Sequence, residues 1–262
     1  MTWIGRRDRW VFAALGTVLL GYFLFPFLTF LSRTTANAPT EAVSATAREA
    51  AVNSLLTAPV TTVIATVFGV PLAYTLARTS FRGKRLVEGL VVLPLVLPPV
   101  VAGAMLLTGV GRFTPVGGFF AGLGLGLTDS RAGIVLAQTF VAAPFVVITA
   151  RAGFASVDRR LEQASRSMGY GPVATFWHVS LPLARGMVLA GVVLTFARAV
   201  GEFGATMMVA FNPRTMPTAI WVEFVSGGVD ATVPLALALL AISLLVILAT
   251  RRLGHAPALG DW

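Results

Sequence analysis

Residues 156–183 read SVDRRLEQASRSMGYGPVATFWHVSLPL, a polar stretch between two long apolar ones. We expect a short helix to begin after Asp158 and to end at Gly169, because glycine adopts a left-handed C-terminal conformation at little cost. One face of this helix carries Leu161, Ala164, Ser165 and Met168. Pro172 suits the start of a second short helix, since its missing N–H is not needed there.

The two predicted helices would form a small apolar ridge with a basic rim. The second helix contributes Val173, Phe176 and Trp177 to the ridge, and the rim consists of Arg159, Arg160 and Arg166. Two interpretations of this pattern remain open. The ridge is either a docking surface for a protein in the water phase or a pair of interfacial helices lying on lipid.

The rest of the chain has the composition of a membrane protein. Of its 262 residues, 56% are hydrophobic and 12% are charged, and the mean hydropathy is +0.82. Six stretches are long and apolar enough to cross a bilayer as helices, near 10–31, 53–77, 89–111, 132–150, 183–211 and 231–250. We therefore predict an all-α integral membrane protein in which residues 1–262 form a single transmembrane domain.

The distribution of cations predicts the orientation. With the N-terminus in the cytoplasm, 14 Arg and Lys residues fall on the inside: Arg6, Arg7, Arg9, Arg78, Arg82, Lys84, Arg85, Arg151, Arg159, Arg160, Arg166, Arg185, Arg251 and Arg252. Only 5 fall outside: Arg33, Arg48, Arg112, Arg131 and Arg214. This bias follows the positive-inside rule and places both termini in the cytoplasm. Because these cations are spread over several segments without interleaved aromatic residues, nucleic acid is not an expected partner.

The third predicted span contains the sequence LPLVLPPVVAG at 93–103. Pro94, Pro98 and Pro99 remove three backbone donors from this helix. Unbonded carbonyl groups at membrane depth are tolerated where they are buried in protein or face a water-filled cavity. The segment is therefore either a kinked packing helix or a lining of a pore.

The fifth predicted span contains an ionisable pair. Arg198 and Glu202 are four residues apart, so on a helix they share a face and can pair. Charged residues at membrane depth usually face a partner or a cavity. The pair has two possible roles, as a structural ion pair or as a part of a translocation path.

Several enzyme classes are disfavoured by the residues that are missing. The sequence has no cysteine, and its two histidines, His178 and His255, have no ligand-spaced companions, so neither a metal nor another cofactor is expected. Its only lysine, Lys84, is followed by Arg85 where a nucleotide-binding P-loop requires Ser or Thr. We therefore expect no ATPase site in this chain.

The quoted stretch is similar to the cytoplasmic "EAA" loop of the membrane subunits of ATP-binding-cassette (ABC) importers. The resemblance rests on Gln163-Ala164-Ser165, Gly169 and Leu181-Pro182. It implies that residues 156–183 form a coupling loop that contacts an ATPase subunit. In the family pattern a glutamate stands where this chain has Gln163, and Glu162 directly precedes it.

A second resemblance concerns the substrate. ARAVGEFGAT at 197–206 and RTMPTAIW at 214–221 are similar to molybdate/tungstate-type permeases, and the match extends over about residues 50–250. It implies the type I ABC importer (MetI-like) architecture, a homodimer, two cytosolic ATPase subunits and an external oxyanion-binding protein. A sulfate or thiosulfate permease is the nearest alternative, and an ion-coupled secondary transporter or a membrane scaffold without transport is a more distant one.

Overall fold

The computed structural model describes residues 6–34 and 45–253, and every regular element within these ranges is a helix. The helices are α1 (Arg6–Thr34), α2 (Ala45–Arg78), α3 (Lys84–Val96), α4 (Pro99–Val110), α5 (Pro115–Gly122), α6 (Arg131–Ser156), α7 (Arg159–Ser167), α8 (Pro172–Thr175), the π-helix η1 (Phe176–Ser180), α9 (Leu181–Val200), α10 (Gly204–Val209) and α11 (Met216–Leu253). His255 and both chain ends lie outside the described residues.

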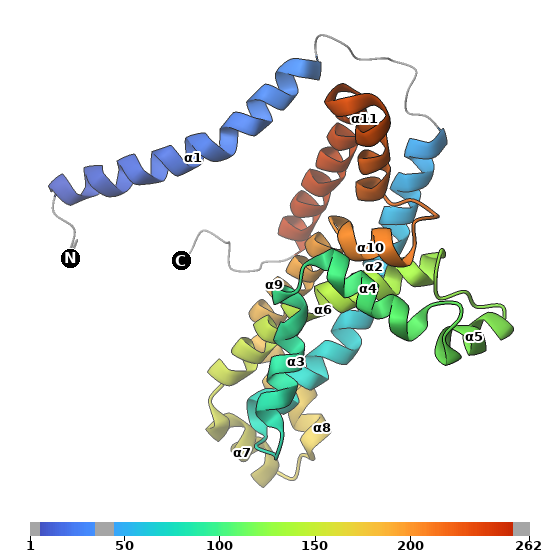
Figure 1. Ribbon diagram of the computed structural model, residues 1–262. Coiled ribbons are helices and arrows are strands. Elements are labelled where there is room, and N and C mark those ends of the chain that lie inside the picture. Colours follow the sequence, from blue (N-terminus) through green and yellow to red (C-terminus); the bar gives the residue numbers. More distant parts are fainter. Residues whose placement is uncertain (1–5, 35–44, 254–262) are drawn as a thin grey trace.

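Three long helices, α2, α6 and α9, pack against one another and form the core of the molecule (Figure 1). Their interface is built mostly from small and β-branched side chains, including Ala65, Ala73, Val146, Ala150 and Ala184. Gly191 lies against α6, where an added Cβ would be 3.0 Å from the Val146 Cα atom. Small residues therefore allow these helices to approach closely, as expected of helices packed within a membrane.

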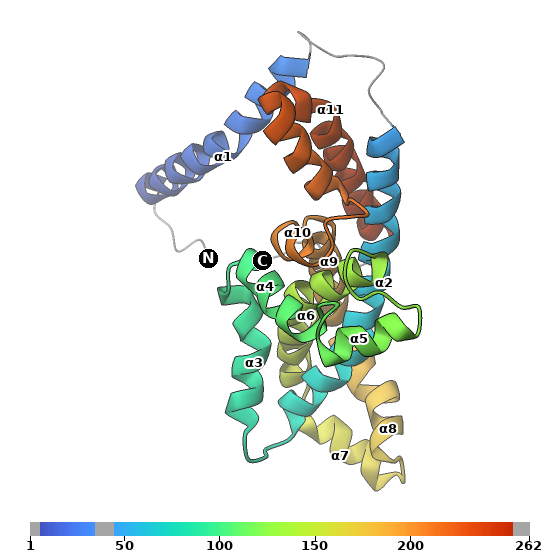
Figure 2. The same cartoon turned by 45° about the vertical axis from the view of Figure 1, so that its right-hand side comes forward.

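The predicted class, an all-α membrane protein, is confirmed. Within the described residues, five helices are long and apolar enough to cross a membrane, and a bent pair formed by α3 and α4 supplies a sixth crossing if it counts as one span. α1 stands apart from the core in both ribbon views and contacts α11 (Figures 1 and 2). The side chains of Trp10 to Ser32 are almost all exposed, so the apolar surface of α1 faces away from the core.

The third span differs from the single helix expected at 89–111. α3 ends at Val96, α4 begins at Pro99, and the two axes are bent by 120°. The physical reason is the Pro98-Pro99 pair. A residue before proline is forced out of the helical region, and here Leu97 (ψ 135°) and Pro98 (ψ 132°) both have extended backbones.

The fifth span also differs from the expected range, 183–211. The helix begins at Pro172, runs through η1 into α9 and ends at Val200, and the separate helix α10 starts only at Gly204. The interruption at 201–203 was not predicted. Apolar residues resume directly after Glu202, so averaged hydropathy does not reveal the break.

The second span is longer than its predicted range, and an additional helix precedes the sixth. α2 begins at Ala45 rather than near 53. α11 begins at Met216, but a sharp kink at Gly228, whose φ of 71° lies in the left-handed region, divides it into two helices. The part after the kink corresponds to the span predicted near 231–250. These additional turns are less apolar than the predicted spans, which is why the hydropathy pattern missed them.

The two helix interruptions lie side by side, because α4 packs against α10. A Cβ added to Gly204 would be 2.9 Å from the Pro99 Cβ atom and 3.0 Å from the Val100 nitrogen. A Cβ added to Gly103 would be 2.7 Å from the Met208 Cβ atom and 2.8 Å from the Ala205 carbonyl oxygen. Contact between the broken spans therefore requires glycine on both helices.

This contact predicts different effects for two Gly→Ala substitutions in α4. Gly103→Ala should lower the melting temperature in detergent, because overpacking of a close contact costs about 1–3 kcal/mol. Gly109→Ala is the matched control, since nothing lies within 4 Å of the added methyl group. It should leave the melting temperature unchanged or raise it slightly, because alanine favours a helix over glycine by about 0.5–1 kcal/mol. Equal effects of the two substitutions would contradict the close packing of α4 on α10.

Candidate functional site

The segment predicted to dock a partner, residues 156–183, lies at one end of the helical core. α7 and α8 project from that end in both ribbon views, below the ends of α2 and α6 (Figures 1 and 2). Asp158 caps α7 by accepting a hydrogen bond from the Arg160 backbone N–H at 2.9 Å. The helix therefore begins where the sequence predicted.

The turn that follows α7 has the conformation predicted for Gly169. Its φ is +90°, in the region that favours glycine. Two backbone hydrogen bonds close the turn, from the Gly169 N–H to the Arg166 carbonyl oxygen and from the Tyr170 N–H to the Ser165 carbonyl oxygen. This pattern ends α7 and reverses the chain towards α8.

The second predicted helix is not a separate element. α8, η1 and α9 follow one another without a break, so that Leu181 and Pro182 lie inside a helix that runs from Pro172 to Val200. Proline has no N–H to donate and its ring crowds the preceding turn. The wider π turn accommodates it: the Leu181 N–H donates to the Phe176 carbonyl oxygen, five residues earlier.

The two sides of α7 have unequal surroundings. Ser165 is buried, and its hydroxyl lies 3.1 Å from the Thr175 hydroxyl, which joins α7 to α8. Leu161, Ala164 and Met168 share the predicted face with Ser165 but are exposed. Most of the apolar face of α7 therefore points away from the protein.

The exposed apolar residues of α7 and of the following helix form one projecting surface. We call it the docking ridge, and it consists of Leu161 (49% exposed), Met168 (72%), Val173 (71%) and Trp177 (59%). Gln163 and Pro182 are also exposed, and Leu181 is half-buried. The docking ridge is a small apolar surface that projects from the helical core and is surrounded by exposed polar residues.

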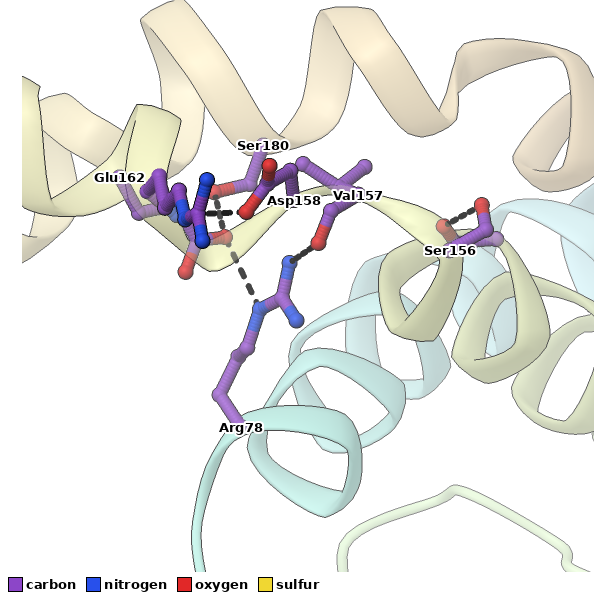
Figure 3. Close-up of polar contacts among 8 residues, drawn as sticks. Arg78, Ser156, Val157, Asp158, Glu162 and Ser180 are labelled. Atoms are coloured by element: carbon purple, nitrogen blue, oxygen red, sulfur yellow. Dashed lines mark hydrogen bonds and ion pairs between the residues drawn. The ribbon is translucent and has the colours of Figure 1, made fainter.

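Beneath the docking ridge lies a buried ion pair that the sequence did not predict. The Arg78 Nε donates to the Glu162 Oε1 at 2.9 Å, and both side chains are less than a tenth exposed (Figure 3). The Arg78 Nη2 donates to the Val157 carbonyl oxygen at 2.9 Å, and the Ser180 hydroxyl donates to the same Glu162 oxygen at 2.6 Å. The available sequence signal was a carboxylate, Glu162, on an otherwise basic helix.

A second candidate site lies at the far end of α9. Arg198 and Glu202 form the predicted ion pair, but Glu202 lies beyond the end of α9 rather than on the same helix. The fully buried Glu202 carboxylate also accepts the Ala205 N–H at 2.7 Å and so holds the start of α10. Arg198 remains 26% exposed. The pairing prediction was correct, but its helical geometry was wrong.

The three prolines of the third span occupy different environments. Pro94 is buried within α3, Pro98 is exposed at the bend, and Pro99 contacts Gly204 at the start of α10. Pro98 and Pro99 therefore form an interruption next to the Glu202 interruption. Pro94 belongs to the packing of α3 instead.

The docking ridge and the Arg198–Glu202 pair are distant from each other but are joined by one element. From Ser180 to Arg198 the chain rises along α9 by about 27 Å at 1.5 Å per residue. Within residues 6–34 and 45–253, no group of three or more His, Cys, Asp or Glu side chains has an arrangement that could hold a metal ion. The arrangement is that of an exposed apolar surface linked by a helix to a charged interruption in the bundle.

Comparison with known proteins identifies the family. Residues 65–256 match the binding-protein-dependent transport system inner membrane components. A probable molybdenum ABC transporter permease of Haloferax volcanii is 49% identical over 249 residues, which cover 93% of this chain and 89% of the relative. The molybdate/tungstate transport system permease WtpB of Pyrococcus abyssi is 35% identical over 259 residues, which cover 95% and 97%.

Two solved structures have a similar fold. A bacterial alginate ABC transporter, solved in complex with an alginate pentasaccharide-bound periplasmic protein, superposes with a TM-score of 0.77 at 15% identity and 95% coverage of each chain. The MetNI methionine ABC transporter in inward-facing conformations superposes with a TM-score of 0.65 at 17% identity, over 82% of this chain and 97% of the other. The architecture is that of the type I, MetI-like ABC importer permeases, and the chain belongs to the family of inner membrane components of binding-protein-dependent transport systems.

Proposed function

We propose that this protein is the membrane-spanning subunit of an ATP-driven importer that carries an oxyanion, molybdate or tungstate, into the cell. The observation that carries the proposal is the exposed docking ridge, which lies at one end of an apolar helical core. The turn at Gly169 joins the two helices that form this ridge. The substrate follows from the relatives named for molybdenum, molybdate and tungstate. Such a subunit would function as a homodimer with two ATPase subunits and an external binding protein.

The need for a separate ATPase follows from energetics. Concentrating a solute a thousandfold costs about 4 kcal/mol. Moving a divalent anion against an inside-negative potential of about 100 mV costs roughly 4.6 kcal/mol more. Because the sequence contains no P-loop, this energy would come from an ATPase partner bound at the docking ridge.

The docking assignment predicts a difference between two neighbouring glycines. Gly169→Val should abolish co-purification of the ATPase, because a β-branched residue at φ +90° costs at least about 1–2 kcal/mol and reshapes the turn. Gly171→Val is the matched control: Gly171 has a φ of −70°, and nothing lies within 4 Å of either added Cβ. Normal ATPase binding by Gly169→Val, with membrane insertion of both variants verified, would count against the docking ridge as the ATPase contact.

The translocation path would pass the two adjacent helix interruptions. They place Pro98 and Pro99 next to the Arg198–Glu202 pair, where the partly exposed Arg198 side chain would attract an anion. Glu202 is fully buried and bonded to both Arg198 and α10. In this proposal Arg198 shapes the field along the path, whereas Glu202 holds Arg198 and α10 in position.

A double-mutant cycle distinguishes this role from a purely structural one. Arg198→Ala and Glu202→Ala should each lower thermal stability in detergent, because truncating one partner of a fully buried pair costs about 3–5 kcal/mol. The loss should be smaller here, since Arg198 is 26% exposed. The double variant should recover part of the stability but not the binding-protein-dependent uptake of molybdate, because the attracting cation is gone.

Other outcomes of that cycle lead to different conclusions. Recovery of uptake in the double variant would assign the pair a structural role only. Additive losses in both stability and uptake would show that the two side chains are not coupled. Stimulation of ATP hydrolysis by the binding protein loaded in turn with molybdate, tungstate or sulfate would identify the substrate.

The orientation predicted from the cations places the docking ridge in the cytoplasm. The chain has no cysteine, so single cysteines at exposed positions report its topology directly. A cysteine at Ser226 should be labelled by a membrane-impermeant maleimide in intact cells, and one at Ser167 only after permeabilisation. Labelling of Ser167→Cys from outside would reverse the proposed orientation.

A further inference from the structure

Arg78 occupies a position from which it can fix the docking segment to the helical core. We infer that Arg78 is a positioning residue for energy coupling: it ties the docking ridge to α2, α6 and α9, so that movement of the ATPase displaces these three helices together. The inference rests on the proposed function, because it requires an ATPase at the docking ridge. It concerns how movement is transmitted, not how the partner binds.

The guanidinium of Arg78 spans two segments at once. It is the last residue of α2, and its Nε and Nη2 donate to the Glu162 carboxylate on α7 and to the carbonyl oxygen of Val157, the residue that follows α6, each at 2.9 Å. Its planar fork fixes the directions of both hydrogen bonds, which a flexible lysine ammonium would not do. The ends of α2 and α6 and the start of α7 are therefore held in one geometry.

Glu162 extends this contact to a fourth segment, the π-helix η1. Its Oε1 accepts the Ser180 hydroxyl at 2.6 Å as well as the Arg78 Nε (Figure 3). Ser180 is the last residue of η1 and is directly followed by α9. Both side chains of the ion pair are less than a tenth exposed, so these charge-assisted hydrogen bonds are largely shielded from competing water.

An aromatic cluster joins the same elements one helical turn away. Tyr74 of α2, Phe154 of α6 and Phe176 of η1 have ring centroids 5.0 to 5.8 Å apart. Phe154 is fully buried. Tyr74 precedes Arg78 by four residues, so the aromatic and polar contacts lie on the same face of α2. The docking segment, residues 156–183, is therefore held to the core by two successive layers of contacts, one polar and one aromatic.

The broken span α3–α4 is tied to the core by a different contact. On α3, Glu88 pairs with Arg151 of α6 at 2.8 Å, and these side chains are 24% and 41% exposed. This ion pair does not involve the docking segment. Its removal therefore provides a matched control for loss of a charge pair between two helices of the same protein.

The test measures coupling in the complete transporter, reconstituted with its ATPase and binding protein in vesicles. Arg78→Gln should leave ATPase co-purification and basal ATP hydrolysis unchanged. The molybdate taken up per ATP hydrolysed should fall about tenfold, which corresponds to about 1.4 kcal/mol of lost coupling. Arg151→Gln should change this ratio less than about twofold, whereas Arg78→Lys should have an intermediate effect because it retains the charge but not the fork.

A chemical rescue tests whether coupling depends on the physical connection between positions 78 and 162 or on the charge of Arg78. Arg78→Cys combined with Glu162→Cys should be uncoupled, and a short bismaleimide that joins the two thiols should restore molybdate uptake per ATP. The cysteine-free sequence makes this cross-link specific when cysteine-free partner subunits are used. If Arg78→Gln does not insert into the membrane, the rescue still tests whether the Arg78–Glu162 contact transmits movement.

Two results would overturn the inference. Wild-type coupling in Arg78→Gln would show that the contact does not transmit movement, and loss of ATPase binding in that variant would assign Arg78 to the shape of the docking surface instead. Failure of the proposed function has a different signature. In that case Gly169→Val would retain the ATPase, or no ATPase would bind the wild-type protein.

Discussion

Backbone amide and carbonyl groups at membrane depth need partners within the protein, and this constraint governs how the broken helices of this chain are arranged. The two interruptions pack against each other. Gly204 contacts Pro99, and the buried Glu202 carboxylate accepts the N–H of Ala205. The Glu202 carboxylate thus supplies a hydrogen bond that the interrupted helix lacks, and glycine permits the close contact with Pro99.

Helix α9 connects these two interruptions to the opposite end of the molecule. α9 begins beside Ser180, and three residues separate its end from the start of α10. At the first end, Glu162 joins Ser180 to Arg78. In the proposed importer, a displacement of the docking ridge would reach the Arg198–Glu202 pair through a continuous helix rather than through flexible loops, which suits mechanical transmission over about 27 Å.

Features governed by neighbouring residues were predictable. The turn at Gly169 that follows α7 and the start of α8 at Pro172 follow from backbone preferences of single residues. Hydropathy predicted the apolar spans, although their ends differed where polar turns extend α2 and α11. The spacing of Arg198 and Glu202 predicted their ion pair, and proline content marked the third span as irregular.

By itself, then, the sequence determined the helical membrane class, the glycine turn of the docking segment and the ionisable pair. The tertiary structure decided which distant groups meet. Arg78 pairs with a residue 84 positions away, and the 120° bend of α3–α4 places one interruption beside another about 100 residues further along the chain. Hydropathy and local conformational preference act over a few residues, whereas these contacts depend on how α2, α6 and α9 pack, so no local pattern specifies them.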